Sequence, residues 1–266
     1  APLSRIVARV PAPALGWTAA RVVAARAEGA VRGEDRRISN GLVDVAAEEA
    51  GTFRIGEISG IGRLVDGGDC GDSYNYAPPP DDELVEQPTS VSVELTAAGP
   101  VRAELTVVRT YRWPLGLAPG SSGRAAEAAD VPVTTRLELR EGEPFVRVRI
   151  AFDNPAVDHR VRIHIPLPRP APSSFAEGQF GVVERTGAPE GGWGEVPLAT
   201  YPARGFVAAG GLAALLEHVT EYEVLDEREL ALTVLRSTGL ISRAANPYRD
   251  DPAGPELAIR AAQCRG

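Results

Sequence analysis

Hydrophobic and polar residues alternate one by one over much of the middle of the chain. Val91, Val93 and Leu95 alternate with polar residues, a turn follows over 97–100, and the alternation resumes over 101–107. Successive side chains of a β-strand point to opposite faces, so such alternation indicates a strand with one buried face. The two runs therefore predict a β-hairpin.

The same pattern returns further along the chain. Residues 133–140 and 145–150 alternate on either side of a turn, and residues 160–165 form a third run. Strands at this spacing, separated by turn residues, are typical of an all-β fold. We expect a large, mostly antiparallel β-sandwich. We leave open a division into two lobes, the first of them over about residues 1–85.

Two segments depart from this pattern. Residues Ala20–Ala30 are rich in alanine, and Leu212–Glu223 carries leucines and a valine at the spacing of one helix face. Alanine favours helices, and apolar residues three or four apart indicate an amphipathic helix. Taken alone, these residues predict two helices.

Composition narrows the possible partners. The 266 residues carry a net charge of −8, which argues against a nucleic acid or an anionic membrane as partner. No run of 18 apolar residues and no leader pattern occurs, so we expect a cytoplasmic protein without a membrane span. The absence of methionine leads us to expect a piece of a longer protein. Homo-oligomer formation stays open.

The cysteines and histidines offer little metal chemistry. Cys70 and Cys264 are far apart in the sequence, so we expect two free thiols. His159 and His164 lie five apart on an expected strand and so point to opposite faces. No Cys-x-x-Cys, His-x-His or His-Glu-x-x-His motif occurs, so we expect no zinc site within this chain. No Gly-x-Ser-x-Gly motif marks a serine nucleophile.

The densest polar segment is 66–80, with the sequence DGGDCGDSYNYAPPP. Its aspartates, glycines and tyrosines leave three interpretations open. The loop could bind Ca²⁺ through carboxylate oxygens, although it lacks the usual calcium-loop pattern. It could be an ordered turn whose aspartates accept hydrogen bonds from backbone N–H groups. It could also bind a sugar, with rings stacking and carboxylates or amides holding hydroxyl groups.

A second polar segment, 154–162, leads from a turn into the third predicted strand. It carries Asp158, His159 and Arg160 in succession. We interpret these three residues as a structural turn in which Asp158 and Arg160 brace the backbone.

Taken together, these segments resemble the C-terminal β-domain of glycoside hydrolase family 38, the α-mannosidases. The likeness is to bacterial members similar to mannosylglycerate hydrolases. It runs in the family's order over nearly the whole chain, and 66–79 is its most specific part. The segments that carry it are 10–17, 38–42, 66–79, 154–168, 230–237, 240–243 and 253–255.

The resemblance implies a fold and a setting. The fold would be a galactose-mutarotase-like super-sandwich spanning residues 1–266. Family members look like retaining α-mannosidases whose nucleophile and zinc ligands sit in an N-terminal α/β barrel, followed by a helical bundle. Neither would belong to this chain, which would hold no cofactor and no catalytic residue of its own. Its partners would be that barrel and an α-mannoside substrate.

The resemblance also bears on residues. The 66–76 loop would help wall the sugar pocket, through residues that bind the sugar or position those that do; these are Asp69, Asp72, Tyr74, Asn75 and Tyr76. It implies strands in place of the two helices, one over Trp17–Ala27 and two over Leu212–Val224 around a turn near His218. The alternatives are a stand-alone carbohydrate-binding module and a purely structural bracing domain.

Overall fold

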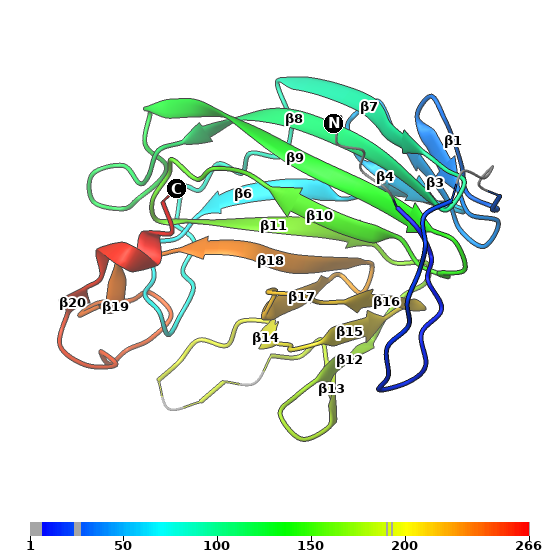
Figure 1. Cartoon of the computed structure of the whole chain (residues 1–266). Helices are drawn as coiled ribbons and strands as arrows, with labels where there is room; N and C mark the ends of the chain where they lie inside the picture. The colour runs from blue at the N-terminus through cyan, green and yellow to red at the C-terminus, as the bar shows by residue number, and fades with distance from the viewer. Residues whose placement is uncertain (1–6, 24–27, 190, 193, 266) are drawn as a thin grey trace. The chain divides into compact units, whose positions relative to one another are not determined.

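The chain is built from antiparallel β-sheets, as the computed structural model in Figure 1 shows. The structure describes residues 7–23, 28–189, 191–192 and 194–265. The predicted all-β fold is confirmed, because the described residues form twenty strands and a single short 3₁₀ helix. Cys70 is buried, Cys264 is exposed, and both are free thiols, as expected.

Two compact units make up the chain. The first consists of Ala1–Glu57, Val91–Val108 and Thr134–Ala151, and the second of Ile58–Ser90, Arg109–Val133 and Phe152–Gly266. The first lobe over about residues 1–85, which the sequence left open, differs from these units in that residues 58–85 belong to the second. The units are not consecutive in sequence, because β8 and β9 each contribute residues to both.

The N-terminal strands form a five-stranded sheet in sequential order. Its strands are β1 (Arg32–Glu34), β2 (Arg37–Ser39), β3 (Asp44–Ala47), β4 (Phe53–Ile55) and β5 (Ile58–Ile61). The first four pair as antiparallel neighbours through short turns. This order is that of a meander, in which each strand pairs with the next one in the sequence.

The predicted hairpins form the second sheet, in the order β10-β9-β8-β7. Its strands are β7 (Ser90–Ala98), β8 (Arg102–Pro114), β9 (Ala128–Arg140) and β10 (Arg147–Ala151). Ala103, Leu105 and Val107 are buried while the residues between them are partly exposed. The alternation in the sequence therefore marks the buried face correctly.

The third sheet carries most of the residues considered below, in the order β14-β17-β18-β11-β6. Its strands are β6 (Arg63–Gly68), β11 (His159–Pro166), β14 (Thr200–Pro202), β17 (Glu221–Leu225) and β18 (Glu229–Ser237). The third predicted strand is β11, which pairs with β6 on one side and β18 on the other. Because it is a central strand, six of its eight residues are buried.

Two smaller sheets and the 3₁₀ helix complete the second unit. The fourth sheet has the order β13-β12-β15-β16, and β19 pairs with β20. These elements are β12 (Ser173–Glu177), β13 (Val182–Thr186), β15 (Phe206–Ala209), β16 (Leu212–Leu215), β19 (Leu240–Ser242), β20 (Leu257–Ala258) and η1 (Arg260–Gln263).

An aromatic cluster anchors the core of the second unit. The indole of Trp113, 1% exposed, lies edge-on to Phe152, with ring centroids 5.2 Å apart, and to His159, with centroids 5.6 Å apart. Trp113 comes from β8 and His159 from β11, so this cluster links residues of the second and third sheets within the unit.

The two helices expected from composition and spacing are wrong. Leu212–Leu215 and Glu221–Leu225 are the strands β16 and β17, separated by a turn in which His218 has a φ of 64°. This agrees with the two strands implied by the family resemblance. Residues 17–23 and 28–30 form neither helix nor strand, so the strand implied there is also wrong for those residues. Residues 24–27 lie outside the described part of the chain.

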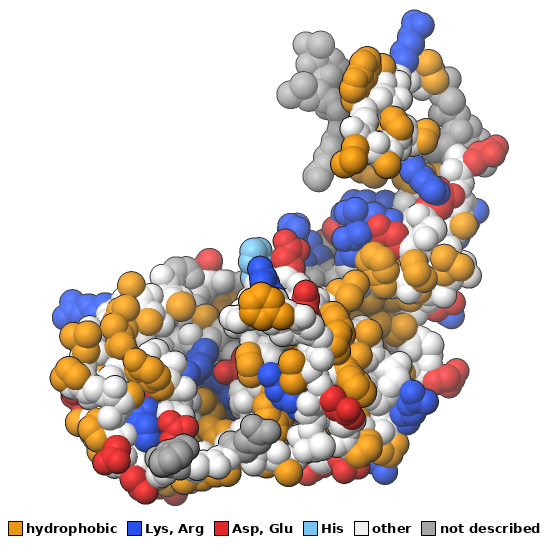
Figure 2. Space-filling model, turned by 90° about the horizontal axis from the view of Figure 1, so that it is seen from below, with side chains coloured by type: hydrophobic (Ala, Val, Ile, Leu, Met, Phe, Trp, Pro, Cys, Tyr) orange, Lys and Arg blue, Asp and Glu red, His pale blue; other side chains and the backbone are white. Residues whose placement is uncertain are grey.

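The charged side chains on the face in Figure 2 are mixed. Among the described residues on that face, acidic and basic groups are interspersed with hydrophobic ones. Within the described residues, no helix has the length and apolar character that crossing a membrane requires.

Asn40, 3% exposed, connects two turns of the first unit. Its side-chain oxygen accepts hydrogen bonds from the N–H groups of Leu42 (3.0 Å) and Val43 (2.8 Å). Its amide nitrogen donates to the carbonyl oxygens of Arg140 (2.8 Å) and Glu143 (2.7 Å). One side chain thus satisfies four backbone groups.

We predict that Asn40→Ala lowers the free energy of unfolding by about 2–4 kcal/mol, because it leaves backbone groups without partners in a buried site. Thermal unfolding measures the change. Ser39→Ala is the control, because the Ser39 hydroxyl accepts only one exposed bond, from the N–H of Gly41. Equal unfolding temperatures for both variants would contradict this role.

Glu229 forms a partly buried ion cluster on the third sheet. Its carboxylate accepts hydrogen bonds from Arg63 Nη2 (2.9 Å) and His164 Nδ1 (2.8 Å). Burial alone would raise the pKa of Glu229, but the bonds from His164 and Arg63 lower it from 4.5 to about 2. The charged carboxylate therefore stabilises the fold.

A carboxylate with a lowered pKa stabilises the folded state fully above its ordinary pKa, and that contribution is lost as the pH falls toward the folded value. We predict that the wild-type chain loses about 2 kcal/mol more stability between pH 4.5 and 2 than Glu229→Gln, allowing for partial exposure. Thermal unfolding against pH tests this. Glu217→Gln, whose side chain is 89% exposed, should follow the wild type.

Candidate functional site

The loop over Asp66–Tyr76 leaves the end of β6 and folds back on itself. The N–H of Cys70 donates to the carbonyl of Ala77 (2.7 Å), and that of Asp72 to the carbonyl of Asn75 (3.1 Å). A Cβ atom on Gly71 would lie 2.0 Å from the Asn75 carbonyl oxygen. Glycine is required here because only its bare backbone fits this close approach.

Asp66 anchors the start of the loop inside the second unit. It is 1% exposed, and its carboxylate lies 2.6 Å from His159 Nδ1 and 2.7 Å from Arg124 Nη2. His159 Nε2 lies 3.0 Å from the side-chain oxygen of Asn154. Both ring nitrogens thus face oxygen acceptors. The buried carboxylate is compensated on both sides, as burial of a charge requires.

Asp69 closes the first turn of the loop. Its Oδ1 accepts hydrogen bonds from the N–H groups of Gly71 (2.9 Å) and Ala77 (3.2 Å). Its Oδ2 accepts a bond of 2.7 Å from Arg236 Nε on β18. Both oxygens of this carboxylate, which is 1% exposed, are therefore engaged within the chain.

Asp72 closes the second turn and is fully buried. Its Oδ1 accepts bonds from the N–H groups of Tyr74 and Asn75, both 3.0 Å long. Its Oδ2 accepts from the Arg243 N–H (2.8 Å) and from Arg249 Nη2 (2.7 Å). Burial raises the pKa of Asp72, but the bonds from Arg249 and the backbone outweigh it and hold the pKa below its ordinary value.

The remaining three predicted residues sit at the loop's outer end. Tyr74 is 63% exposed, with Arg249 6.0 Å from its ring centroid. Asn75 accepts a hydrogen bond from Arg249 Nη1 (2.5 Å) through its side-chain oxygen. Tyr76 is half-buried, and the guanidinium carbon of Arg160 lies 3.4 Å from its ring centroid. Burial raises the pKa of the Tyr76 hydroxyl, so that hydroxyl stays protonated.

The five predicted residues thus fall into two groups, a buried pair and three residues at the outer end of the loop. The carboxylates of Asp69 and Asp72 accept hydrogen bonds from the backbone and from arginines, as in the ordered-turn interpretation. Tyr74 and Asn75 present side chains at the surface, while Tyr76 borders a cavity. Among the five residues, these last three therefore have the accessible side chains.

The turn before β11 forms a hydrogen bond with the 66–76 loop. Asp158 has a φ of 52°, its carbonyl accepts from the Asp69 N–H (2.9 Å), and its carboxylate accepts from Gln263 Nε2 (2.7 Å). His159 contacts Asp66, as described. Arg160 points instead to Tyr76 and to Glu221, whose carboxylate lies 3.3 Å from its Nη1. It therefore joins the loop to β17 rather than bracing its own turn.

Four arginines that bind carboxylates or carbonyl groups of the loop were not predicted from the sequence. They are Arg124, Arg236, Arg243 and Arg249. Arg236 and Arg243 lie in segments that carry the family resemblance, which was their only signal. Arg249 lies in a stretch rich in proline and aspartate that reads simply as a loop. Nothing in local sequence shows that it pairs with Asp72, 177 positions earlier.

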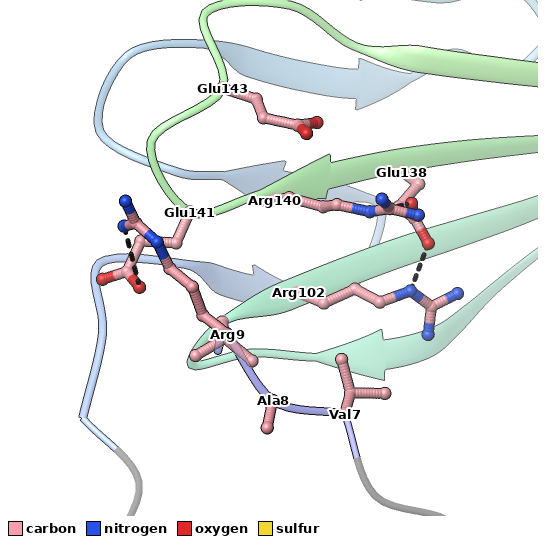
Figure 3. Close-up of a pocket in the computed structure, with 9 residues that line it drawn as sticks. Val7, Ala8, Arg9, Arg102, Glu138, Arg140, Glu141 and Glu143 are labelled. Carbon is pink, nitrogen blue, oxygen red and sulfur yellow. Dashed lines mark hydrogen bonds and ion pairs between the residues drawn. The ribbon is translucent and has the colours of Figure 1, made fainter. Parts of the chain in front are cut away.

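Two cavities open among the described residues. The larger, of about 610 Å³, lies in the first unit and is drawn in Figure 3. Its arginines face its glutamates: Arg9 lies 4.0 Å from Glu141, and Glu138 pairs with both Arg102 and Arg140. Its polar groups are thus largely paired with one another. The smaller, of about 350 Å³, lies in the second unit beside Tyr76.

Metal binding finds no support in the described side chains. Within that part of the chain, no group of three or more histidine, cysteine, aspartate or glutamate residues is placed to hold a metal ion. The resemblance implies zinc ligands in the N-terminal barrel and not among the residues described here.

Comparisons with known proteins add an independent finding. No family model matches the chain. A protein of Halalkalibacterium halodurans named "Putative mannosylglycerate hydrolase" is 30% identical over 122 residues, which is 44% of this chain and 13% of that protein. The chain thus matches only a small part of that relative.

Solved structures agree over a larger part of the chain. An α-mannosidase from Enterococcus faecalis covers 90% of it with a TM-score of 0.77 and 20% identity, and a glycosyl hydrolase family 38 protein from the same species covers 90% with a TM-score of 0.71 and 19% identity. The chain spans 29% and 30% of those two. The predicted resemblance is thus confirmed: this chain is similar, in fold over most of its length and in sequence over part of it, to a portion of the glycoside hydrolase family 38 α-mannosidases.

Proposed function

We propose that this chain is the C-terminal β-domain of a larger glycoside hydrolase that acts on α-mannosides. The observation that carries the proposal is the fold match over 90% of the chain to an α-mannosidase of which it spans 29%. The sequence match to a protein named as a mannosylglycerate hydrolase points to the same chemistry.

The bond-breaking groups would come from the rest of that protein. A retaining hydrolase needs a carboxylate nucleophile and an acid or base held about 5 Å apart beside the sugar. In the 66–76 loop, Asp69 and Asp72 use both carboxylate oxygens in hydrogen bonds within the chain, so neither is free to attack a sugar carbon. Zinc and its ligands would likewise belong to the catalytic barrel.

The loop would help wall the sugar pocket where the domain packs on that barrel. Tyr74 and Asn75 are exposed or half-exposed, and both lie beside Arg249. An aromatic ring and an amide are groups that recognise a sugar through stacking and hydrogen bonding. The buried carboxylates of Asp69 and Asp72 would then act as positioning groups that fix the tip of the loop.

We predict that this chain alone, with added Zn²⁺, hydrolyses an aryl α-mannoside no faster than background. The complete enzyme, assayed in parallel, should show turnover, because it would contain the nucleophile and the zinc ligands. Release of the coloured aryl alcohol measures both. Zinc-dependent turnover by the isolated chain would overturn the proposed division of labour.

We further predict that Tyr74→Ala in the complete enzyme raises KM about 3- to 10-fold, since it removes a stacking surface for the substrate. Asp72→Asn should lower kcat/KM about tenfold, because the loop tip loses its charged partner for Arg249. Steady-state kinetics measure both effects.

Phe180→Ala is the matched control for Tyr74→Ala, because Phe180 is likewise an exposed aromatic residue but lies between β12 and β13. It should leave both constants unchanged. Folded Tyr74→Ala and Asp72→Asn enzymes with wild-type constants would remove the loop from the substrate site.

A further inference from the structure

The cavity of about 350 Å³ beside Tyr76 has a wall of polar side chains. This wall is formed by β11 and β17, neighbours of β18 in the third sheet. Arg160 and Arg162 lie two positions apart on β11, so their side chains share one face of the sheet. Glu223 on β17 faces Arg162, whose Nη1 donates to it at 2.6 Å.

Both guanidinium groups are fixed yet retain unused donors. Arg160 is 5% exposed, stacks on Tyr76 at 3.4 Å and donates through Nη1 to Glu221 at 3.3 Å. Arg162 donates through Nη1 to Glu223. Each guanidinium has five N–H groups, more than these bonds use, and both arginines line the cavity. They are held in place before any ligand arrives.

The charge of this wall is compensated. The lining includes two cationic side chains, Arg160 and Arg162, and two anionic ones, Asp82 and Glu223. A site for a phosphate or carboxylate would need an excess of positive charge, because a bound anion would otherwise meet the two carboxylates at close range. Fixed donors beside fixed acceptors instead suit hydroxyl groups, which both donate and accept.

The rest of the lining is apolar. Leu84, Leu198 and Leu225 border the same cavity, and the hydroxyl-bearing Thr200 stands at the end of β14. A small cyclic polyol has the matching character, with C–H groups that pack on leucine and hydroxyl groups around its rim. The cavity volume also falls within the range of small-molecule sites.

We propose that this cavity is a binding site for a neutral, polyhydroxylated ligand of monosaccharide size, held by Arg160, Arg162 and Glu223. The site goes beyond the hydrolase role proposed above, because it is contained in this chain and needs no catalytic partner. The two proposals can fail separately. The hydrolase role is tested by kinetics of the complete enzyme, and the sugar site is tested by binding to the isolated chain.

The test is titration of the isolated full chain with mannose, glucose and galactose, followed by calorimetry and by NMR line shifts. We expect saturable binding of at least one sugar with a Kd of about 1–10 mM. Arg162→Gln and Thr200→Val should each weaken it about fivefold or more, because each removes a hydrogen-bonding group from the wall. Thr200→Val conserves volume and breaks no ion pair, so it reports on binding even where Arg162→Gln unfolds.

Arg185→Gln is the matched control. Arg185 also stacks on a tyrosine, 5.2 Å from the ring centroid of Tyr201, but it does not line this cavity. It should bind sugar like the wild type. No saturation with any sugar up to about 50 mM overturns the proposal. Equal binding by all variants overturns it too, as does Arg162-dependent binding of inorganic phosphate in place of sugar.

Discussion

A buried carboxylate is stable in a protein only where hydrogen bonds and opposite charges replace the water it has lost. Asp66, Asp69 and Asp72 are each at most 1% exposed, and they lie within seven residues of one another. The second unit is arranged around this requirement. Arg124, Arg236 and Arg249 come from three separate parts of the chain, and each reaches one of these carboxylates.

The same requirement explains the rigidity of the loop's outer end. Tyr74 and Asn75 donate their backbone N–H groups to a carboxylate that is itself fixed by Arg249 and by the backbone of Arg243. The side chains of Tyr74 and Asn75 therefore project from a backbone whose conformation is restricted by these hydrogen bonds. Such pre-ordering lowers the entropy that a ligand must otherwise overcome on binding. A loop rich in glycine by composition is thus firmly held by its aspartates.

The sequence predicted best where the structure depends on neighbours along the chain. The hairpins over 91–107 and 133–150 show clean alternation, because each has one buried face. The leucines at 212, 215 and 216 gave a wrong prediction of a helix, since a spacing of three or four residues also arises in a short strand followed by a turn. The ordered-turn interpretation of Asp69 and Asp72 could be drawn from local sequence, because turn-forming aspartates depend on residues two or three positions away. The pairing of Arg236 with Asp69 and of Arg249 with Asp72 could not be predicted from local sequence, because the partners lie 167 and 177 positions apart along the chain.

These separations along the chain also determine when each ion pair can form during synthesis. The ribosome releases the 66–76 loop long before it makes Arg236, Arg243 and Arg249, and a nascent chain grows by about 5–20 residues per second. For about 10–35 seconds Asp69 and Asp72 therefore lack the arginines that pair with them in the folded chain. The second unit cannot form the ion pairs of Asp69 and Asp72 until these late residues have emerged, so completion of the loop is a late step in folding.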